Sequence, residues 1–396
     1  MSTLQEYRIS EIAEVIGGGT PDTKDESLWN GDIAWITPAD LSRNKEKYFR
    51  IGERSITQKG LKESSTRLLP KGTVLLSSRA PIGYLAIAAN SICTNQGFKS
   101  LVCYTDIVSN EYLYYYLLLQ RDYLETISSG ATFPELSGGT LKKLKILLPP
   151  LPTQQRIASI LSAYDDLIEV NYQRIKLLEE TARELYKEWF VRMRFPGYKK
   201  AKFVKGVPEG WEVVRLDNVL SFKTGKLNSN ASTLDGQYPF FTCSNADFKT
   251  DTYSFDTEAV LLAGNNAAGI YPLKYYKGKF DAYQRTYIIK PKSDDISHKY
   301  VYYYFLERLE FLQTISIGAA TQFLTTQMLK KLLMFLPHKN LMLRFSIIVD
   351  PIFEQVQILN QQNTQLRQIR DRLLPRLISG KLEVKEKQKL IQDVKS

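Results

Sequence analysis

The sequence predicts an α+β protein in which two similar mixed α/β modules alternate with two long helices. A tyrosine-rich stretch occurs twice, as EYLYYYLLLQRDYLETISSGA at residues 111–131 and as KYVYYYFLERLEFLQTISIGA at residues 299–319. Other segments recur at a similar separation. Each repeat is followed by a long segment with a seven-residue apolar period. The predicted order is therefore module, helix, module, helix.

The repeat extends on both sides of the tyrosine stretch. Tyr112 and Tyr300 are 188 residues apart, and the same separation aligns Lys142 with Lys330. Upstream, GTVLLSSRAPIGYLAI (72–87) resembles EAVLLAGNNAAGIYPL (258–273). A period near 190 residues is too long for a solenoid, so we interpret it as a duplicated module with its connector.

Within each module, short apolar runs bounded by Gly and Pro, such as GTVLLSS and YLAIAA, predict strands. The tyrosine stretch has helical spacing, with one face formed by Tyr112, Tyr115, Tyr116 and Leu119. We interpret these tyrosines as core residues rather than as a contact surface.

The long segments predict two helices with a coiled-coil seam, because apolar residues are spaced four and three apart over more than four heptads. The first seam is Ile157, Leu161, Tyr164, Ile168, Asn171, Ile175, Leu178, Ala182, Leu185 and Trp189. The second is Phe345, Val349, Ile352, Val356, Leu359, Asn363, Leu366, Arg370, Leu373 and Leu377. Pro375 predicts that the second helix bends or ends there.

Each seam contains one asparagine, Asn171 in the fifth layer of the first and Asn363 in the sixth layer of the second. In an antiparallel pairing layer five meets layer six, so the two amides would face each other and fix the register. We therefore predict an antiparallel intramolecular coiled coil with pseudo-two-fold symmetry. Its roughly 33 residues per helix would hold the modules about 50 Å apart. The alternative is that each helix packs on its own module and both asparagines are exposed.

These segments predict five parts. They are a first module (1–150), a first helix (151–195), a second module (196–338), a second helix (339–380) and a charged tail (381–396). The turn residues Pro196, Gly197, Pro208 and Gly210 mark the junction after the first helix.

The composition favours a nucleic-acid partner. The chain has 396 residues and a net charge of +11, which suits double-stranded DNA, although a merely basic protein remains the alternative. Three cysteines without CxxC spacing and two histidines argue against structural zinc and fit a reducing cytoplasm. No signal peptide and no apolar run of membrane-spanning length is present, so we expect no membrane partner.

Motifs for catalysis are incomplete. Asp350-Pro351-Ile352-Phe353 lacks the second proline of an amino-methyltransferase motif and lies inside the second predicted helix. Residues 17–19 are three glycines followed by Thr20-Pro21, not by a long helix, and there is no P-loop. The acid–x–lysine pair at residues 383–385 lies in the charged tail, which we interpret as solvated. We predict a non-catalytic chain with no metal site and no cofactor of its own.

Loops of a rigid scaffold usually carry recognition. Arginine can bind guanine, side-chain amides can bind adenine, and lysines suit phosphates. The predicted DNA-binding residues of the first module are Thr20, Pro21, Thr23, Lys24, Thr37, Arg79, Asn95, Gln96, Lys99 and Thr132. Those of the second module are Lys223, Lys226, Asn228, Ser244, Asn265, Asn266, Gln284, Arg285, Thr321 and Gln322. For each residue the alternative is a turn-stabilising polar group or a solvated charge.

Two basic modules of different sequence at the ends of one rod would read two different short sites. The predicted target is therefore asymmetric and bipartite. Two other classes of function remain as alternatives: an autonomous DNA-modifying enzyme with diverged motifs, and a scaffold that binds only proteins.

Four segments resemble the specificity subunit of type I restriction-modification systems: LPPLPTQQRIASILSAYDDLIEVNYQRI, LLPRLISGKLEV, LPKGTVLLSSRAPIGYLAIA and CTNQGFKSLV. The resemblance spans essentially the whole chain. It implies two target recognition domains, two spacer helices, two methyltransferase subunits as partners, and restriction subunits in the full complex. S-adenosylmethionine, and ATP and magnesium for restriction, would bind in those partner subunits, which methylate adenine N6.

Partner-subunit contacts are predicted at Pro149, Pro150, Gln154, Gln155, Arg156, Trp189 and Arg344. In the second half the PPLPTQQR signature becomes LPHKNLMLR, with His338, Asn340 and Leu343 in place of Pro150, Pro152 and Gln155. This departure weakens the prediction of the same contact there.

Overall fold

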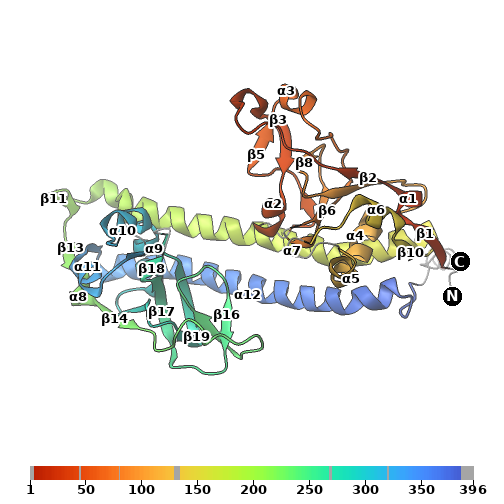
Figure 1. The fold of residues 1–396 in the computed structure, drawn as a ribbon. Helices are drawn as coiled ribbons and strands as arrows, with labels where there is room; N and C mark the ends of the chain where they lie inside the picture. The colour runs from red at the N-terminus through yellow and green to blue at the C-terminus, as the bar shows by residue number, and fades with distance from the viewer. Residues whose placement is uncertain are drawn as a thin grey trace, which may run out of the picture. The chain divides into compact units, whose positions relative to one another are not determined.

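The computed structural model describes residues 4–43, 46–79, 81–128, 134–266, 270–318 and 321–384. The chain divides into two compact units, Met1–Gln173 with Asn360–Ser396, and Arg174–Leu359. Each unit contains one mixed α/β module and part of both long helices, α7 (Leu151–Tyr186) and α12 (Lys339–Ile378) (Figure 1). The predicted fold class is confirmed. The five predicted domain limits stay a prediction, because this division cuts through both helices.

The first unit is built on a five-stranded sheet with the order β2-β9-β6-β7-β4. Its strands are β2 (Ala13–Gly17), β4 (Tyr48–Phe49), β6 (Val74–Ser78), β7 (Ile82–Ala88) and β9 (Lys99–Cys103). Neighbours are antiparallel except β7 and β4, which run parallel. The predicted strand within GTVLLSS is β6, and it is buried along its whole length.

Smaller elements complete this unit. A three-stranded sheet has the order β5-β3-β8, and β1 pairs antiparallel with β10. These strands are β1 (Gln5–Arg8), β3 (Trp29–Ile36), β5 (Arg54–Ile56), β8 (Cys93–Thr94) and β10 (Lys145–Leu148). The short helices are α1 (Ile9–Ile12), η1 (Glu26–Leu28), α2 (Pro38–Arg43), α3 (Gln58–Lys62), α4 (Asn110–Leu119), α5 (Arg121–Thr126) and α6 (Gly138–Lys143).

The second unit repeats the central order. Its six-stranded sheet runs β14-β20-β17-β19-β15-β16, so β14, β20, β17 and β19 follow the order of β2, β9, β6 and β7. The parallel pairing of β15 with β19 matches that of β4 with β7. The strands are β14 (Leu220–Thr224), β15 (Tyr238–Phe241), β16 (Phe248–Thr250), β17 (Phe255–Ala263), β19 (Leu273–Ala282) and β20 (Thr286–Pro291).

Three antiparallel strand pairs and several short helices surround this sheet. The pairs are β11 (Phe203–Val204) with β12 (Val207–Pro208), β13 (Glu212–Arg215) with β22 (Leu333–Leu336), and β18 (Asn265–Asn266) with β21 (Gln322–Phe323). The helices are η3 (Tyr198–Lys200), α8 (Leu216–Val219), α9 (His298–Leu306), α10 (Leu309–Ile315) and α11 (Thr326–Lys331).

Each tyrosine-rich stretch folds as two helices, α4 with α5 and α9 with α10. The hydroxyls of Ser109 and Ser297 cap α4 and α9 by accepting hydrogen bonds from backbone amides. The interpretation of the tyrosines as core is confirmed, since four are at most 1% exposed: Tyr112, Tyr115, Tyr300 and Tyr304. The predicted buried face is wrong at Leu119, which is exposed, whereas Tyr114 is buried. Burial is not confined to one face of α4, because the sheet and α7 both cover this helix.

In the first unit α7 and α12 run antiparallel. The amide Nδ2 of Asn171 donates a hydrogen bond to Oδ1 of Asn363 at 2.9 Å, and both side chains are buried. Asp165, before Asn171 on α7, pairs with Arg370, after Asn363 on α12. The two asparagines therefore meet as the predicted pairing requires, and their role in fixing the register stays a prediction.

In the second unit the same helices are joined by aromatic packing. The rings of Tyr186 and Trp189 lie 6.2 Å and 6.1 Å from the ring of Phe345. One π-helical turn, Lys187–Val191, follows α7 and carries Trp189. In both units every predicted seam position is buried or partly buried.

The C-terminal end of α12 differs from the prediction. The helix continues through Pro375 to Ile378, so Pro375 does not end it. Leu382 and Val384, at the start of the predicted charged tail, are partly buried against the core of the first unit. These residues of the tail are therefore packed rather than solvated, and residues 385–396 lie outside the described ranges.

Each module is fastened to a long helix by a lysine whose side chain has little solvent exposure. In the first unit Nζ of Lys47 donates to Oγ of Ser162 at 2.5 Å and lies 3.6 Å from Oε1 of Glu111. In the second, Nζ of Lys299 lies 3.1 Å from Glu258 and 3.2 Å from Asp350. We call these groups the first and second clasps.

Burial is the dominant cause that lowers the pKa of Lys47, while the nearby carboxylate of Glu111 opposes it. The side chains of Lys47 and Lys299 are 4% and 13% exposed. Buried charges of this kind are tolerated only with partners, so each clasp fixes its module on α7 or α12.

Replacement of Asn171 by leucine is expected to lower the free energy of unfolding by about 1–3 kcal/mol, because it leaves the buried amide of Asn363 without its partner. The double replacement Asn171→Leu with Asn363→Leu is expected to be at least as stable as the unchanged protein, since apolar seam residues pack well. Urea denaturation measures both. A double variant as unstable as the single one would show that the amides are not coupled.

Candidate nucleic-acid interface

The predicted recognition loops of the first module are joined by backbone hydrogen bonds. The amide of Gly19 donates to the carbonyl of Thr94 at 2.9 Å, and that of Asn95 donates to Ile36 at 2.9 Å. Ser78 donates to Gly97 at 2.7 Å and accepts from Leu136 at 2.9 Å. We call residues 18–24, 37, 78–79, 94–99 and 134–137 the first loop cluster. It brings together the ends of β2, β3, β6 and β8.

The close approach of these loops depends on Gly18. A Cβ atom on this residue would lie 2.0 Å from the carbonyl oxygen of Asn95, a distance that the backbone does not allow. The glycine run therefore acts as a packing site between two recognition loops.

The predicted side chains of this cluster differ in their burial and in whether they have hydrogen-bond partners. The hydroxyl of Thr20 donates to Oε1 of Gln96, so these two predicted residues are in contact. Thr37 donates to Asp40 through its amide at 2.8 Å and its hydroxyl at 2.7 Å. Arg79 is partly exposed and has no hydrogen-bond or ion-pair partner within the described ranges. Pro21 is buried, which contradicts its prediction as a DNA contact, and Thr132 lies outside the described residues.

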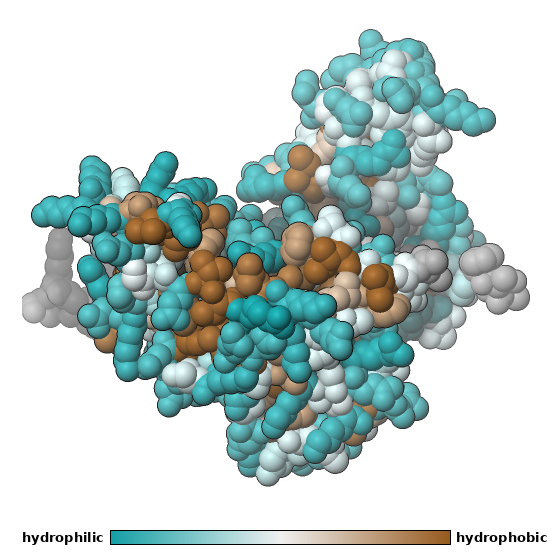
Figure 2. Space-filling view, turned by 90° about the vertical axis from the view of Figure 1, so that its left-hand side faces the viewer, coloured by the Kyte–Doolittle hydropathy of each residue, from teal (hydrophilic) through white to brown (hydrophobic). Residues whose placement is uncertain are grey.

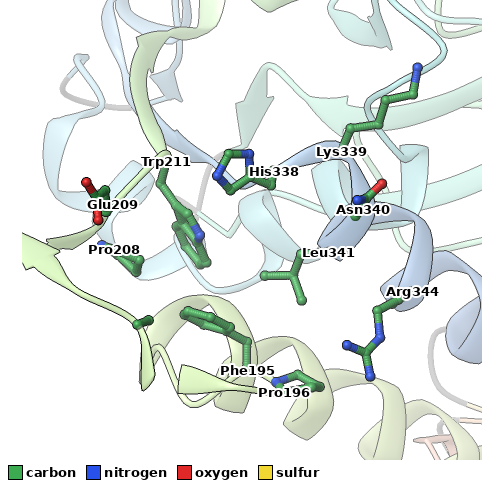
Figure 3. A pocket seen from close by; sticks show the side chains of 11 residues that line it. Phe195, Pro196, Pro208, Glu209, Trp211, His338, Lys339, Asn340, Leu341 and Arg344 are labelled. Carbon is green, nitrogen blue, oxygen red and sulfur yellow. The ribbon is translucent and has the colours of Figure 1, made fainter. Parts of the chain in front are cut away.

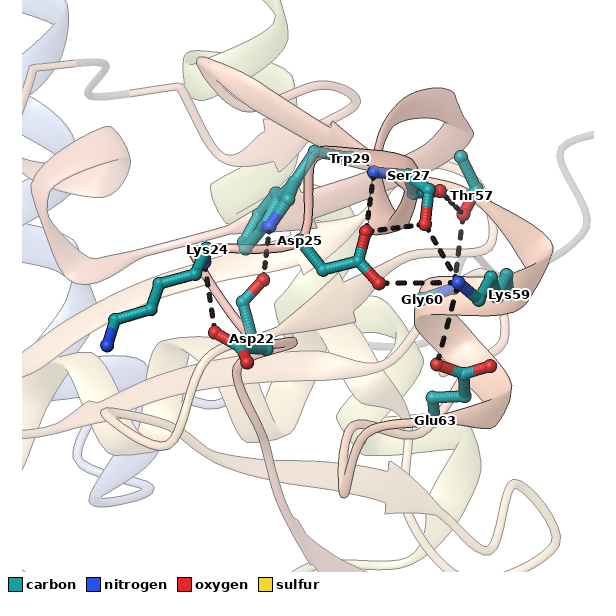
Figure 4. A network of polar contacts seen from close by, with 9 residues as sticks. All are labelled: Asp22, Lys24, Asp25, Ser27, Trp29, Thr57, Lys59, Gly60 and Glu63. Atoms are coloured by element: carbon teal, nitrogen blue, oxygen red, sulfur yellow. Dashed lines mark hydrogen bonds and ion pairs between the residues drawn. The ribbon is translucent and has the colours of Figure 1, made fainter.

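The loop that carries Thr23 and Lys24 is held by a polar network (Figure 4). Oδ1 of Asp25 accepts from the amide and the hydroxyl of Ser27 at 2.9 Å and 2.6 Å, and its Oδ2 lies 3.3 Å from Nζ of Lys59. The hydrogen bonds from Ser27 lower the pKa of Asp25, and Lys59 adds to the effect. Figure 4 shows the Lys24 side chain pointing away from this network, where a phosphate can reach it.

The second module builds an equivalent arrangement. Gly264 donates to the carbonyl of Arg285 at 2.7 Å, and Leu324 donates to Gly264 at 2.8 Å. The latter bond repeats the one between Leu136 and Ser78. Gln284 donates to Leu227 at 2.9 Å. We call residues 224–228, 242–245, 264–266, 283–285 and 321–324 the second loop cluster.

All ten predicted residues of the second module are exposed or partly exposed. Exposed side chains are those of Lys223, Lys226, Asn228, Gln284, Arg285 and Thr321, and partly exposed ones are those of Ser244, Asn265, Asn266 and Gln322. Gln322 accepts a hydrogen bond from Ser316 at 3.1 Å. Oδ1 of Asn265 is buried and has no partner in the part of the chain that the structure describes. Lys223 lies within β14, at the edge of the cluster.

Two charged features lie outside the predicted site residues. Glu135 lies 3.1 Å from Nζ of Lys99 and compensates its charge, and nothing in its sequence context signals this. The other is a set of six cations without an acid over residues 192–205, which is visible in the sequence as a charge run.

Three of the predicted partner contacts, Pro149, Gln154 and Trp189, are contradicted by burial. Gln154 is 1% exposed; its Nε2 donates to the carbonyls of Pro149 at 2.9 Å and Ile107 at 3.1 Å, and its Oε1 accepts from Ser109 at 3.1 Å. All of this bonding fastens α7 to its own module. Trp189 is buried against Phe345.

The other predicted partner contacts vary in exposure. Pro150, Gln155 and Arg344 are exposed and stay candidates. Arg156 is partly exposed and donates to Thr153 at 3.3 Å.

A pocket of about 540 Å³ lies in the second unit, where the altered signature begins α12 (Figure 3). Figure 3 shows Phe195, Trp211 and Leu341 facing one another, with Arg344 at one side. The rings of Phe195 and Trp211 are 5.3 Å apart. The pocket therefore combines apolar walls with a cationic edge, a surface that suits a protein partner.

Part of α12 in the second unit is apolar and uncovered. Leu343 and Ile347, one helical turn apart, are 58% and 64% exposed. Figure 2 displays the side of the molecule on which β11 lies in Figure 1, and shows exposed hydrophobic side chains gathered between hydrophilic ones. Exposed apolar surface of this kind marks protein contacts.

Other kinds of site find little support. No helix in the described ranges is long and apolar enough to cross a membrane. The described residues contain no group of three or more His, Cys, Asp or Glu that could hold a metal ion. Burial raises the pKa of Cys93 to about 11 and of Cys103 to about 12, so neither thiol is a ready nucleophile. Asp350–Phe353 lies within α12, as predicted.

Comparison with known proteins agrees with this architecture. A family model described as the type I restriction modification DNA specificity domain matches residues 1–180 and 208–368. The type I restriction enzyme MjaIX specificity subunit of Methanocaldococcus jannaschii is 37% identical over an alignment of 410 residues, covering 96% of this chain and 93% of that protein. The type I restriction enzyme EcoDI specificity subunit of Escherichia coli is 51% identical over 85 residues, which is 22% of this chain and 18% of that protein.

Among solved structures, the type I restriction-modification system S subunit from M. genitalium has a TM-score of 0.58 at 16% identity, covering 95% of this chain and 96% of that chain. That likeness supports the fold. The family model covers both halves of the chain, and the MjaIX relative matches nearly its whole length. The chain therefore belongs to the type I restriction-modification DNA specificity family, and it is a specificity subunit of a type I restriction-modification system.

Proposed function

We propose that the chain recognises an asymmetric, bipartite sequence in double-stranded DNA, with one loop cluster reading each half. The observation that carries this proposal is that equivalent repeat segments build both clusters but present different side chains. Arg79 in the first cluster stands where Asn265 stands in the second. A guanidinium group favours guanine and an amide favours adenine, so the two halves would differ.

The chain would also bind two methyltransferase subunits and, in the full complex, restriction subunits. The exposed residues Pro150 and Gln155 and the apolar surface of Leu343 and Ile347 support such contacts. Catalysis would take place in the partners, which would hold S-adenosylmethionine for methylation and ATP and magnesium for restriction. The complex would act in the cytoplasm, where it meets DNA.

Long-read sequencing of N6-methyladenine, in the source cell and in a deletion of this gene, tests the proposal. The expected result is a split motif, two short blocks around a fixed gap, that vanishes on deletion. If no split motif depends on the gene, a direct DNA-binding assay of the purified chain decides whether the partners are silent or the proposal is wrong.

Two alternatives predict different results. An autonomous DNA-modifying enzyme would react when the purified chain is mixed with DNA and either S-adenosylmethionine or magnesium, whereas a specificity subunit alone would leave the DNA unchanged. A scaffold that binds only proteins would not bind DNA, and the net charge of +11 argues against it.

Replacement of Arg79 by alanine is expected to relax or abolish recognition of one half-site. Loss of one bidentate base contact corresponds to about 1–3 kcal/mol, or about 5- to 150-fold in discrimination. The measurement is the affinity of the assembled methyltransferase complex for duplexes substituted at each position of the motif.

Lys24→Ala is the matched control, because Lys24 belongs to the same loop cluster and suits a phosphate rather than a base. It should weaken binding evenly across sequences and reduce the salt slope by about 1. Unchanged affinity and sequence preference in Arg79→Ala would place this loop outside the groove.

A further inference from the structure

The connection from α7 to β13 carries a concentrated positive charge. Residues 192–205 contain Arg192, Arg194, Lys199, Lys200, Lys202 and Lys205 and no acidic residue. This segment of 14 residues therefore contributes +6 to a net charge of +11 for the whole chain. None of these cations belongs to the loop clusters or to the residues predicted to contact DNA or partners.

The connection is an ordered hairpin rather than a loose linker. β11 and β12 pair antiparallel, with Phe203 opposite Pro208 and Val204 opposite Val207. The two turn residues, Lys205 and Gly206, have φ angles of 52° and 80°, as a type I′ turn requires. Glu209 closes the base by donating its amide to the carbonyl of Lys202 at 2.7 Å. Residues 198–208 thus form a fixed platform, which we call the basic hairpin.

The cations of this segment fall into two groups. Arg192 lies 3.1 Å from Glu184 and 2.6 Å from Glu188, and Arg194 lies 3.9 Å from Glu188, so acids of α7 and its π-helical turn compensate them. The four lysines of the basic hairpin are exposed and have no ion-pair partner among the residues described. Four like charges held on one short hairpin repel one another, and a bound polyanion relieves that repulsion.

We propose that the basic hairpin binds backbone phosphates of the DNA that flanks the half-site read by the second module, without reading bases. The inference rests on the proposed function and adds a second kind of DNA contact to it. Lysine ammonium groups act as point charges on flexible stems, which suits phosphates and carries no sequence information. The exposed apolar side chains, Phe203 and Val204, are too few beside four uncompensated charges to favour a protein surface as the occupant.

The expected effect on the salt dependence of DNA binding has an upper limit. Each neutralised phosphate adds about 0.9 to the slope of the logarithm of the binding constant against the logarithm of salt concentration. Four lysines therefore account for a slope of up to about 3.6. Removing them should flatten the salt dependence by that amount and leave the recognised motif unchanged.

The test uses the complex assembled with its methyltransferase subunits and a duplex that contains the motif mapped by methylation sequencing. Lys199, Lys200, Lys202 and Lys205 are replaced together by glutamine, and in the matched control together by arginine, which keeps the charge. The affinity is measured over a range of potassium chloride concentrations. A second series shortens the duplex stepwise beyond the half-site of the second module.

Three results support the inference together. The glutamine variant has a flatter slope, the arginine variant keeps the original slope, and only the glutamine variant is insensitive to shortening the flank. The methylated motif stays the same in all three proteins, because no base contact is lost.

Other outcomes overturn the inference, and they distinguish its failure from a failure of the proposed function. If the unchanged complex binds the split motif and the glutamine variant keeps the slope, the basic hairpin does not touch DNA and the proposed function stands. If the glutamine variant fails to assemble by native mass spectrometry while the arginine variant assembles, the hairpin contacts a protein partner instead. If the unchanged complex prefers no split motif and the purified chain does not bind DNA, the proposed function fails and the inference fails with it.

Discussion

Replacement of Arg370 by methionine is expected to lower the free energy of unfolding of the first unit by about 3–5 kcal/mol. The Arg370 side chain is 18% exposed and pairs with Asp165, whose side chain is 8% exposed. Asp165 also accepts a hydrogen bond from the hydroxyl of Tyr115 in α4. Without the guanidinium group the carboxylate stays buried with one neutral donor, so its desolvation is no longer offset. Urea denaturation of the full chain, followed by hydrogen exchange in α4, measures the loss.

Asp371→Ala is the matched control. Asp371 lies 2.8 Å from Arg370, but its side chain is 58% exposed, so its removal should cost less than about 1 kcal/mol. The double variant Arg370→Met with Asp165→Leu should recover most of the loss, because both buried charges leave together. A loss in Arg370→Met no larger than that in Asp371→Ala would show that the buried pair contributes no more than a surface pair.

The coiled-coil contacts were predictable because heptad spacing is a local signal. The positions of Asn171 and Asn363 within their seams were enough to predict that they meet. Arg370 was also visible as a charge in the seam. Its partner was not, because Asp165 is adjacent to the seam residue Tyr164 and its burial depends on α4, which comes from another part of the chain.

The recognition loops were predictable as sets, because the duplicated strands β6 and β17 end at equivalent loops. Individual side chains were not. Pro21 and Gln154 lie in polar segments and look accessible from the sequence. In the structure Pro21 is buried, and the Gln154 side chain makes its hydrogen bonds to backbone groups of its own module. Whether such residues are buried or exposed depends on long-range packing that no local pattern encodes.

The two clasps show how the duplication has diverged. Glu111 and Ser162 of the first clasp precede Lys299 and Asp350 of the second by the repeat distance of 188 residues. The helix α4 therefore presents an acid where α9 presents a base. In the first unit the cation comes instead from Lys47. Each module consequently fits its own long helix. The exchange of Glu111 or Lys299 for its counterpart places like charges side by side.

Lys299→Glu, which gives the second clasp the residue of the first, is expected to destabilise the second unit by about 3–5 kcal/mol at neutral pH. The new carboxylate would face both Glu258 and Asp350, which Lys299 now bridges at 3.1 Å and 3.2 Å. Hydrogen exchange of the β17 and α9 amides measures the loss in this unit. Lys277→Glu is the matched control, since Lys277 lies 3.9 Å from Glu258 but is 72% exposed, and should cost less than about 1 kcal/mol.

The destabilisation caused by Lys299→Glu should become smaller as the pH falls. This pH dependence distinguishes charge repulsion from a packing defect. Burial alone would raise the pKa of Glu258, but the hydrogen bond from Tyr275 and the charges of His298 and Lys299 outweigh it and lower the pKa below the ordinary value of 4.5. The stability that Glu258 contributes is therefore present above about pH 4.5 and is lost as the pH falls through its lowered pKa. In Lys299→Glu the carboxylates repel until they are protonated, so acid removes the repulsion while it weakens the unchanged clasp. A difference between the two proteins that stays constant from pH 7 to about pH 4 would contradict the electrostatic role of this clasp.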